Sequence, residues 1–371
     1  MKIRSSLVAL TALATVAGLS ACSAPEKKKD SAGSDAASAT SVADFGSMDK
    51  LVAAAKKEGA LNVIALPPDW ANYGEIIKAF SDKYGIKVNS AQPDAASQDE
   101  INAAKQLKGR PTAPDVFDLG QAVALANTDL YAKYKVASFD KVPEDFKDAD
   151  GSWVNDYGGF MAIGYDSKKV PDVTSVADLL KPAYKGKVAL NGDPTTAGAA
   201  FSGVVMASLA NGGSADDIAP GVDFFSRLKK AGNFLPVDPT PATIESGQTP
   251  VVIDWDYTNA AETAKLPSWK VVVPGDQAVG GYYYQAINKD APHPAAARLW
   301  EEFLYSDDGQ NLFLNGGARP VLADEMKSAG TLDEAASAKL PPVNGTPVLL
   351  TQEQNTKAAT YLSQNWANAI K

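Results

Sequence analysis

The feature that most constrains this fold is an apolar strand that runs directly into polar and aromatic side chains. Residues 251–257 read Val-Val-Ile-Asp-Trp-Asp-Tyr. A continuous apolar run is typical of a strand that is buried on both faces of an α/β sheet. Ligands bind outside the carboxyl ends of such strands, so we expect Trp255, Asp256 and Tyr257 to contact a ligand. The alternative is that the two rings only close a core while the carboxylates are solvated.

A second strand with a polar loop at its carboxyl end lies nearer the start of the chain. Residues 61–66 are mostly apolar, the loop Pro67-Pro68-Asp69-Trp70 follows, and a helix then leads to a further strand at 86–89. This order is a βαβ unit, in which the loop after the first strand lies at the carboxyl edge of the sheet. We therefore expect the crevice to be faced by Asp69, Trp70, Asn72 and Tyr73. The alternative for Trp70 is a half-exposed surface ring.

Two more strand ends carry candidate ligand groups. A short strand at 115–119 ends in Gly120-Gln121, and a strand at 187–191 is followed by a turn at 192–198 and a helix. That turn places hydroxyls and free backbone N–H groups at a helix N-terminus, which favours an anionic group. We expect Gln121, Thr195 and Thr196 to face the crevice. An ordinary helix cap by Asp193 is the alternative.

The length of the chain and two long extended stretches predict a two-lobed protein. A chain of 371 residues is too long for one ordinary core. The extended stretches at 157–165 and 280–287 can pass from one lobe to the other and back. We predict a first lobe at 44–155, a second lobe at 156–275, and a return to the first lobe with C-terminal helices at 276–371. Because successive side chains of a strand point to opposite faces, either Tyr283 alone or Tyr282 with Tyr284 can line the crevice; Tyr283 is our candidate.

The first residues of the chain predict export. Lys2 and Arg4 precede an apolar run and the small residues before Cys22, a pattern typical of a secretory signal, here at 1–21, which is too short to span a membrane. Cys22 is the only cysteine, and in an exported protein it could be a free thiol or form an intermolecular disulfide. Residues 22–43 have no apolar periodicity, so we expect them to be a flexible tether.

Composition and motifs argue against other classes of function. The net charge of −9 and the pI near 4.8 argue against a nucleic-acid partner, which needs a basic face. The chain has one histidine, no Gly-x-Ser-x-Gly sequence and no phosphate loop. Asp254 and Asp256 could still act as the acid and base of a glycosidase, and a surface scaffold without a ligand is a further alternative. We predict that the protein is not an enzyme and needs no cofactor.

Several motifs together resemble a known family. They are the small residues before Cys22, the start Lys-Lys-Glu-Gly-Ala-Leu-Asn-Val at 56–63, the Asp-Val-Phe-Asp strand at 115–118, the Gly-Asp-Pro-Thr turn at 192–195, and Ala-Pro-His-Pro-Ala-Ala-Ala-Arg at 291–298 with Ser-Asp-Asp-Gly-Gln at 306–310. They resemble the extracellular solute-binding lipoproteins of bacterial ABC importers of the iron, polyamine, thiamine and aminoethylphosphonate type.

The resemblance implies the fold of the protein, its attachment to the membrane and its partners. It implies a periplasmic-binding-protein-like fold, with two α/β lobes joined by two crossing strands that close over one ligand. It also implies lipidation of Cys22, attachment outside the cell membrane through that lipid, and a permease and ATPase subunits as partners of a monomer.

The ligand expected from the resemblance is a small organic amine. Trp255 matches an aromatic residue that stacks on the ligand in polyamine binders, and rings with carboxylates suit a cation. The second carboxylate of polyamine binders falls here near Tyr283, so an aminoethylphosphonate-like zwitterion or another cation is equally open. Ferric binders resemble this chain too, but Trp255 and Asp256 stand where those proteins usually have adjacent tyrosines. We predict no metal site, and ferric iron is the alternative ligand.

Overall fold

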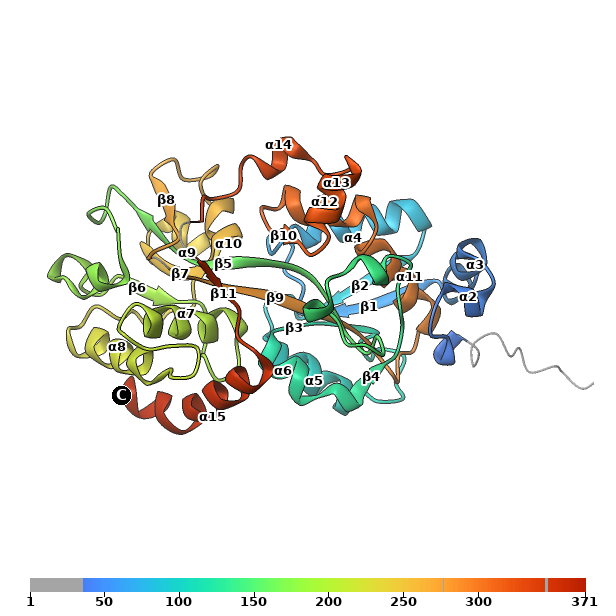
Figure 1. Cartoon of the computed structure of the whole chain (residues 1–371), viewed down its shortest axis with the longest axis horizontal. Coiled ribbons are helices and arrows are strands. Elements are labelled where there is room, and N and C mark those ends of the chain that lie inside the picture. Colours follow the sequence, from blue (N-terminus) through green and yellow to red (C-terminus); the bar gives the residue numbers. More distant parts are fainter. Residues whose placement is uncertain (1–35, 276, 344–345) are drawn as a thin grey trace, which may run out of the picture. The chain divides into compact units, whose positions relative to one another are not determined.

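The computed structural model describes residues 36–275, 277–343 and 346–371 (Figure 1). These residues all belong to one compact unit, 32–371. The predicted signal peptide and Cys22 lie outside the described residues. The fold mixes helices and strands along the chain, as predicted.

The strands are short except for two that are more than ten residues long. They are β1 Ala60–Ile64, β2 Lys87–Ala91, β3 Val116–Leu119, β4 Tyr131–Ala132, β5 Val154–Asp166, β6 Val188–Leu190, β7 Val251–Trp255, β8 Trp269–Val272, β9 Gln277–Asn288, β10 Arg319–Pro320 and β11 Thr346–Val348.

Helices follow most of these strands. They are α2 Val42–Phe45, α3 Met48–Glu58, α4 Tyr73–Tyr84, α5 Ser97–Gln106, α6 Gln121–Ala126, α7 Gly198–Leu209, α8 Ala219–Lys230, α9 Pro241–Ser246, α10 Asp256–Ala261, α11 Pro294–Leu304, α12 Asp307–Asn315, α13 Ala323–Ala329, α14 Glu334–Ser337 and α15 Gln352–Ala369. Short 3-10 turns lie at Thr128–Leu130, Phe139–Lys141, Glu144–Phe146, Val176–Leu180 and Pro182–Tyr184. None of the helices in the described part of the chain is long and apolar enough to cross a membrane.

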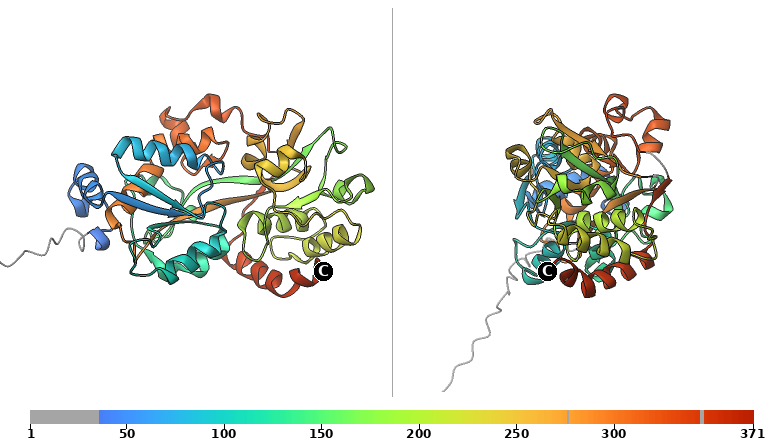
Figure 2. Two further views of the ribbon diagram at one scale, coloured as in Figure 1. Left: turned by 180° about the vertical axis from the view of Figure 1, so that it is seen from behind. Right: turned by 90° about the vertical axis from the view of Figure 1, so that its left-hand side faces the viewer.

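The two long strands β5 and β9 connect two lobes. The first half of β5 pairs with β9 and β10, and its second half pairs with β7 and β8. The second half of β9 pairs with β3 and β4, whereas its first half pairs with β11 and β5. Figure 1 shows β5 and β9 running between a lobe that holds β1 to β4 and a lobe that holds β6 to β8. The view from behind shows the blue strands β1 and β2 in the first lobe and the yellow-green α7 and α8 in the second (Figure 2). The predicted two-lobed α/β fold with two crossing strands is confirmed.

Glycines in the crossing strands are required by close packing. A Cβ atom on Gly159 of β5 would lie 2.5 Å from Asp256 Oδ1, and one on Gly281 of β9 would lie 2.7 Å from the ring of Trp255. Side chains at these positions would displace the end of β7. The glycines in the predicted crossing strands therefore mark a close approach to the residues that follow β7.

The motif at 291–298 holds the first lobe together. His293 donates its backbone N–H to Asp115 Oδ1 at 2.7 Å, and its Nδ1 lies 2.9 Å from Asp115 Oδ2. Glu58 accepts the backbone N–H groups of Ala295 and Ala296 at the start of α11. A carboxylate at a helix N-terminus is favoured because it satisfies free N–H groups. This motif therefore fixes α11 against the ends of α3 and β3.

The end of the predicted tether is packed, which corrects the sequence prediction. The tether was expected to extend to residue 43, but Ala36 and Ala39 are buried. The buried Arg298 of α11 donates to the backbone oxygens of Ala37 and Ala39 at 2.9 and 2.8 Å. Polar, small residues can be ordered without apolar periodicity when a buried guanidinium binds their carbonyl groups.

The C-terminal segment divides between the lobes. Helix α11 packs against α3, and α12 packs against α4, both in the first lobe. Helix α15 instead contacts α8 of the second lobe and α6 of the first, and the rings of Trp366 and Phe225 are 5.3 Å apart. The predicted lobe boundaries at 155/156 and 275/276 stay predictions.

Candidate ligand-binding site

A large cavity lies at the carboxyl ends of strands from both lobes. Its volume is about 560 Å³. From the first lobe it is lined by Asp69 and Trp70 after β1 and by Asp118 of β3; from the second lobe it is lined by Asn191 after β6 and Asp254 of β7. This is the position at which open α/β sheets bind ligands, and the volume is that of a metabolite site.

The lining of the large cavity is acidic. Its carboxylates are Asp69, Asp94, Asp99, Glu100, Asp118, Asp193, Asp238, Asp254 and Glu262. No lysine, arginine or histidine of the described chain lines it. A cleft lined by one sign of charge concentrates ions of the opposite sign, so this cavity attracts cations.

On the side of the first lobe, a chain of hydrogen bonds leads to Asp118. The Trp70 indole N–H donates to the Tyr157 hydroxyl at 2.7 Å, and that hydroxyl donates to Asp118 Oδ2 at 2.8 Å. The backbone N–H of Asp118 donates to Glu100 Oε2 at 3.0 Å. Within the described residues, Asp118 Oδ1 has no hydrogen-bond partner. Burial raises the pKa of Asp118 to about 7, against the opposing effect of the Tyr157 and Tyr73 hydroxyls.

On the side of the second lobe, Asp254 lies among further acceptors. Its Oδ2 accepts a hydrogen bond from Asn191 Nδ2 at 2.9 Å, and its Oδ1 accepts one from the Trp255 backbone at 2.8 Å. Burial raises the pKa of Asp254 to about 7. Asn259 Oδ1 and Glu262 Oε2 are buried and lack partners in the part of the chain that the structure describes. Buried acceptors without donors are costly, and both ends of the cavity therefore combine buried carboxylates with unpartnered acceptors.

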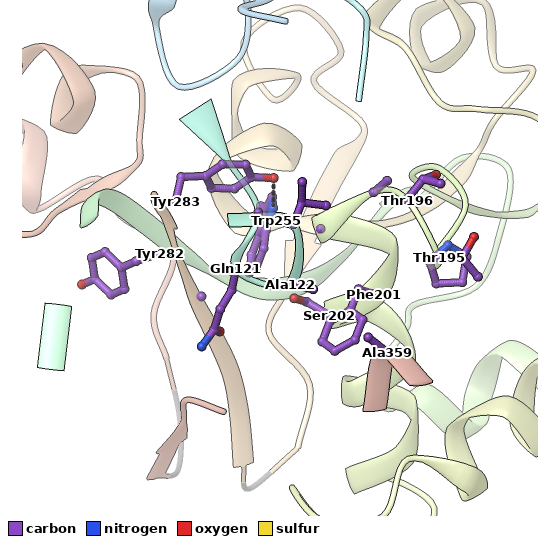
Figure 3. Close-up of a pocket in the computed structure, with 16 residues that line it drawn as sticks. Gln121, Ala122, Thr195, Thr196, Phe201, Ser202, Trp255, Tyr282, Tyr283 and Ala359 are labelled. Atoms are coloured by element: carbon purple, nitrogen blue, oxygen red, sulfur yellow. Dashed lines mark hydrogen bonds between the residues drawn. The ribbon is translucent and has the colours of Figure 1, made fainter. Parts of the chain in front are cut away.

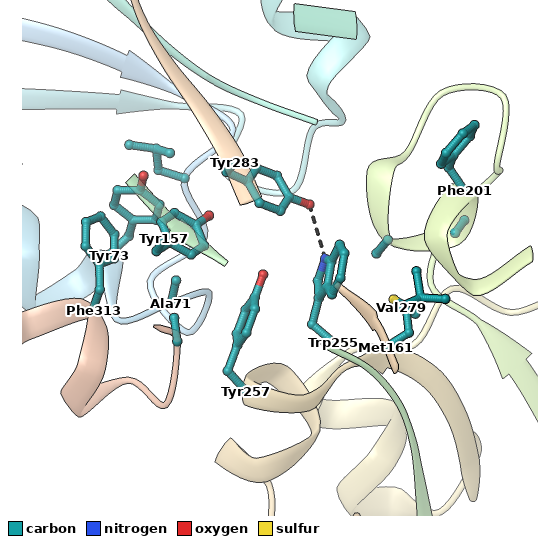
Figure 4. Close-up of a cluster of buried hydrophobic side chains, with 14 of the residues drawn as sticks. Ala71, Tyr73, Tyr157, Met161, Phe201, Trp255, Tyr257, Val279, Tyr283 and Phe313 are labelled. Atoms are coloured by element: carbon teal, nitrogen blue, oxygen red, sulfur yellow. Dashed lines mark hydrogen bonds between the residues drawn. The ribbon is translucent and has the colours of Figure 1, made fainter. Parts of the chain in front are cut away.

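Aromatic rings form one wall of the large cavity. Trp70 and Tyr283 line it, and their ring centroids are 5.7 Å apart in an edge-to-face arrangement. Behind them Tyr157 stacks on Tyr283 at 5.3 Å, and Tyr257 lies 5.7 Å from Trp70. Figure 4 shows Tyr157, Tyr257 and Tyr283 grouped beside Trp255. Ring faces at a cavity wall attract organic cations.

A second, small cavity of about 60 Å³ lies between α6, α7, β9 and α15 (Figure 3). Gln121, Thr195 and Trp255 line it, and they do not line the large cavity. Where the lobes meet beside it, a Cβ atom on Gly120 would lie 3.2 Å from the Cα atom of Gly198. The two lobes thus touch through glycine backbone.

The predicted site residues fall into three groups. Asp69, Trp70, Thr196 and Tyr283 line the large cavity. Gln121, Thr195 and Trp255 line the small cavity, together with Thr196 and Tyr283. Asn72, Tyr73, Asp256 and Tyr257 line neither.

The predicted role of Asp256 in binding a ligand is not supported by its position. Asp256 Oδ2 lies 3.0 Å from Arg319 Nη2, and Oδ1 accepts the backbone N–H groups of Phe160 and Tyr257, each at 3.0 Å. The carboxylate is completely buried. Strand β7 ends at Trp255, and α10 begins at Asp256, so the chain turns before Asp256 and its side chain no longer follows that of Asp254.

Asn72, Tyr73 and Tyr257 were also predicted to face the ligand, but they contact other protein groups and line neither cavity. Asn72 donates to the backbone oxygen of Leu312 at 2.9 Å, and the Tyr73 hydroxyl accepts a hydrogen bond from Gln285 at 2.8 Å. Tyr257 is buried in the aromatic cluster. These side chains support the wall of the site from behind.

The hydroxyl groups of the predicted anion site form hydrogen bonds within the turn. The Thr195 backbone N–H and hydroxyl both donate to Asp193 Oδ1, at 2.8 and 2.6 Å, and the Thr196 hydroxyl donates to the Asp193 backbone oxygen. Asp193 accepts these hydrogen bonds within the turn and does not cap α7, whose N-cap is Ala197 without a side-chain hydrogen bond. The start of α7 lines the large cavity at Gly198 and Ala199, next to Thr196 and Ala197 of the turn.

Sequence reasoning did not assign ligand binding to the acids that define the site, Glu100, Asp118, Asp254 and Glu262; Asp254 was considered only as a glycosidase acid or base. Asp118 and Asp254 could have been found, because each lies near the carboxyl end of an apolar strand, as Trp255 does. Glu100 and Glu262 lie in or just after helices and carry no such signal.

Residues 115–343 match the family described as bacterial extracellular solute-binding protein. Similar solved structures include the periplasmic binding protein AgtB from A. tumefaciens R10 in complex with agropinic acid, with 16% identity, a TM-score of 0.67, and coverage of 84% of this chain and 98% of that chain. Apo ferric ion-binding protein A from Pasteurella haemolytica has 19% identity, a TM-score of 0.62 and the same two coverages. AfuA from Actinobacillus pleuropneumoniae, with fructose-6-phosphate bound, has 18% identity, a TM-score of 0.63, and coverage of 84% of this chain and 98% of that chain. At these identities the likeness shows the fold.

Proposed function

Because this chain belongs to the bacterial extracellular solute-binding proteins and is the substrate-binding component of an ABC importer, we propose that its large cavity captures a small organic amine. The protein is not an enzyme, and proteins of this kind work outside the cytoplasm with permease and ATPase subunits. The proposal concerns the class of solute.

The acidic lining of the cavity is the observation that supports an amine. The cavity presents carboxylates from both lobes and no basic side chain among the described residues. Burying several carboxylates without a counter-charge is unfavourable, and an ammonium group offers both the charge and the missing N–H donors. Trp70 and Tyr283 add ring faces that attract such a cation.

A zwitterion such as an aminoethylphosphonate is the second candidate within this class. The start of α7 lines the same cavity at Gly198 and Ala199, and free N–H groups at a helix start favour an anion. The carboxylates of the cavity oppose a negative group. A cation without an acidic group is therefore the better supported form.

Ferric iron is the alternative ligand. Within residues 36–275, 277–343 and 346–371, no three His, Cys, Asp or Glu side chains are grouped so that they could hold a metal ion. Burial raises the pKa of Tyr257 and of Tyr283 well above the usual range, which opposes the tyrosinate form that a ferric ion prefers. These observations favour the amine.

We propose that the ligand is enclosed by closure of the lobes about β5 and β9. Asp69 and Trp70 of the first lobe would then meet Asp254 and Glu262 of the second across the ligand. The glycine contact between Gly120 and Gly198 is the point at which closure brings the backbones together.

A thermal-shift screen of the purified full chain tests the amine. The probes are 1,4-diaminobutane, choline, thiamine, 2-aminoethylphosphonate, amino acids, sugars and ferric citrate. A bound probe at a hundredfold excess over Kd stabilises the fold by about 2.7 kcal/mol. We expect one amine class to raise Tm and Asp254→Asn to weaken that shift, while Asp145→Asn, an exposed acid outside the cavity, leaves it unchanged. A shift with ferric citrate alone, with a visible tyrosinate colour, would establish iron instead.

We also propose that Cys22 carries the lipid that attaches the protein, as a monomer, to the outside of the cell membrane. The proposal rests on the sequence before Cys22, which lies outside the described residues. Cys22→Ser should move the protein from the membrane fraction to the medium. Retention of the variant in the membrane fraction would contradict the lipid anchor.

A further inference from the structure

Two carboxylates of the large cavity, Glu100 and Asp118, are buried next to each other. Glu100 of α5 is 1% exposed and Asp118 of β3 is 6% exposed, yet both line the cavity. They are linked through the Asp118 backbone N–H, which donates to Glu100 Oε2 at 3.0 Å. Asp118 Oδ1 has no partner in the described chain. The pair thus lies at the cavity wall, with most of its surface buried.

Among the described residues, the groups that interact most strongly with this pair carry no positive charge. They are acids and phenols from several surrounding elements: Tyr73 of α4, Asp99 of α5, Tyr131 of β4, Asp156 and Tyr157 of β5, Tyr257 of α10, Tyr283 of β9, Glu301 of α11, and Tyr305. Lys105, on the same helix as Glu100, donates to Asn127 instead.

Two neighbouring carboxylates in such surroundings cannot both be ionised in the empty protein at neutral pH, because burial and like charge both oppose it. Burial raises the pKa of Asp118 to about 7 and raises that of Glu100 well above its usual range, with Asp118 adding to the effect on Glu100. The pair therefore holds a proton when the cavity is empty.

We propose that a cationic ligand binds beside Glu100 and Asp118 in exchange for the proton that this pair holds, so that each molecule captured releases about one proton. This inference rests on the proposed function. The ammonium group keeps its own protons and the proton of the pair leaves to solvent. With a monocation such as choline, the charge of the filled site then equals that of the empty one. Lowering the pH through about 7 returns the proton and weakens binding.

The fluorescence of Trp70 can report whether Asp118 is protonated in the empty protein. The indole is joined to Asp118 through the Tyr157 hydroxyl by hydrogen bonds of 2.7 and 2.8 Å. A change of charge on Asp118 changes the field on that indole. We expect a fluorescence step near pH 7 that Trp70→Phe and Asp118→Asn each remove and Asp145→Asn retains.

Proton counting tests the exchange directly. The full chain in weak buffer with a pH indicator is mixed with 1,4-diaminobutane or choline, whose charges are constant near neutral pH. We expect close to one proton released for each molecule bound at pH 6.5 and an affinity that falls about tenfold per pH unit below pH 7. At pH 9, where only the quaternary choline keeps a constant charge, binding of choline should release almost no protons. In Asp118→Asn and in Glu100→Gln the release should disappear; Glu100→Gln serves as the test if Asp118→Asn does not fold.

The outcomes separate this inference from the proposed function. Binding of a probe without proton release, with an affinity that does not vary between pH 6 and pH 8, would overturn the exchange and leave the amine receptor intact. Failure of both probes to bind, together with no thermal shift from any amine, would overturn the amine function and the exchange with it.

Discussion

Replacement of Arg319 by methionine should destabilise the fold without abolishing ligand binding. Asp256 is completely buried and its Oδ2 lies 3.0 Å from Arg319 Nη2, so Arg319→Met leaves a buried carboxylate with only two backbone donors. Loss of one partner of a buried ion pair costs about 3–5 kcal/mol. For a chain of this size this corresponds to a fall in Tm of roughly 4–6 °C. Methionine retains much of the packing against Phe160, over whose ring the guanidinium lies at 5.0 Å.

The pH dependence of this loss has a definite sign. Burial raises the pKa of Asp256, and Arg319 is the strongest of the groups that oppose the rise. Without Arg319 the folded-state pKa lies further above the unfolded value, so the variant loses stability as pH rises from about 4. The penalty of Arg319→Met should therefore be larger at pH 8 than at pH 5.

Urea unfolding at the two pH values measures the loss, and calorimetric titration with the amine identified by the screen measures binding. We expect Arg319→Met and Asp256→Asn each to lower the unfolding free energy while the folded protein keeps its Kd within about threefold, a difference of about 0.6 kcal/mol. A variant of Asp256 that abolishes binding at unchanged stability would refute this reasoning and restore the role predicted from the sequence.

Three further predictions follow from other contacts. The empty wild-type protein should become less stable as pH rises from about 4 to about 7, because burial raises the pKa of Asp254 to about 7. In urea unfolding, the free energy of unfolding of Asp254→Asn should vary less with pH than that of the wild type. Gly120→Val should weaken ligand binding about tenfold in calorimetry at little cost in Tm, because its Cβ atom would meet the Cα of Gly198 at 3.2 Å; unchanged affinity would mean that the lobes close elsewhere. Arg298→Met should expose residues 36–39 to limited proteolysis and cost about 1–3 kcal/mol, because it removes the donors to two backbone oxygens; resistance equal to wild type would show that apolar contacts alone hold this segment.

Local patterns predicted the secondary structure well. Ser47 caps α3 by accepting the Lys50 N–H, and α3 ends at Gly59, whose φ of 76° suits glycine. Ser306 caps α12 in the same way. Such caps depend on residues three or four positions apart, so a short stretch of sequence contains the whole interaction.

The boundary between β7 and α10 shows where local pattern stops being sufficient. The apolar run with polar residues at its end predicted that Asp256 contacts a ligand, but β7 ends at Trp255 and α10 begins at Asp256. The chain turns there, and Asp256 contacts Arg319, a residue 63 positions later. No local pattern contains that partner.

The sequence by itself determined the fold class and the family: alternating strands and helices with two long extended stretches predicted a two-lobed α/β fold, and motifs that resemble solute-binding proteins predicted the family. These are all properties of short segments. The tertiary structure decided which polar groups share a cavity. Glu100, Asp118, Asp254 and Glu262 come from segments up to 162 residues apart, and they meet only because β5 and β9 bring the strand ends of two lobes together. Whether a carboxylate binds a ligand or an internal arginine depends on which distant backbone lies beside it, and that information is not local to any stretch of the chain.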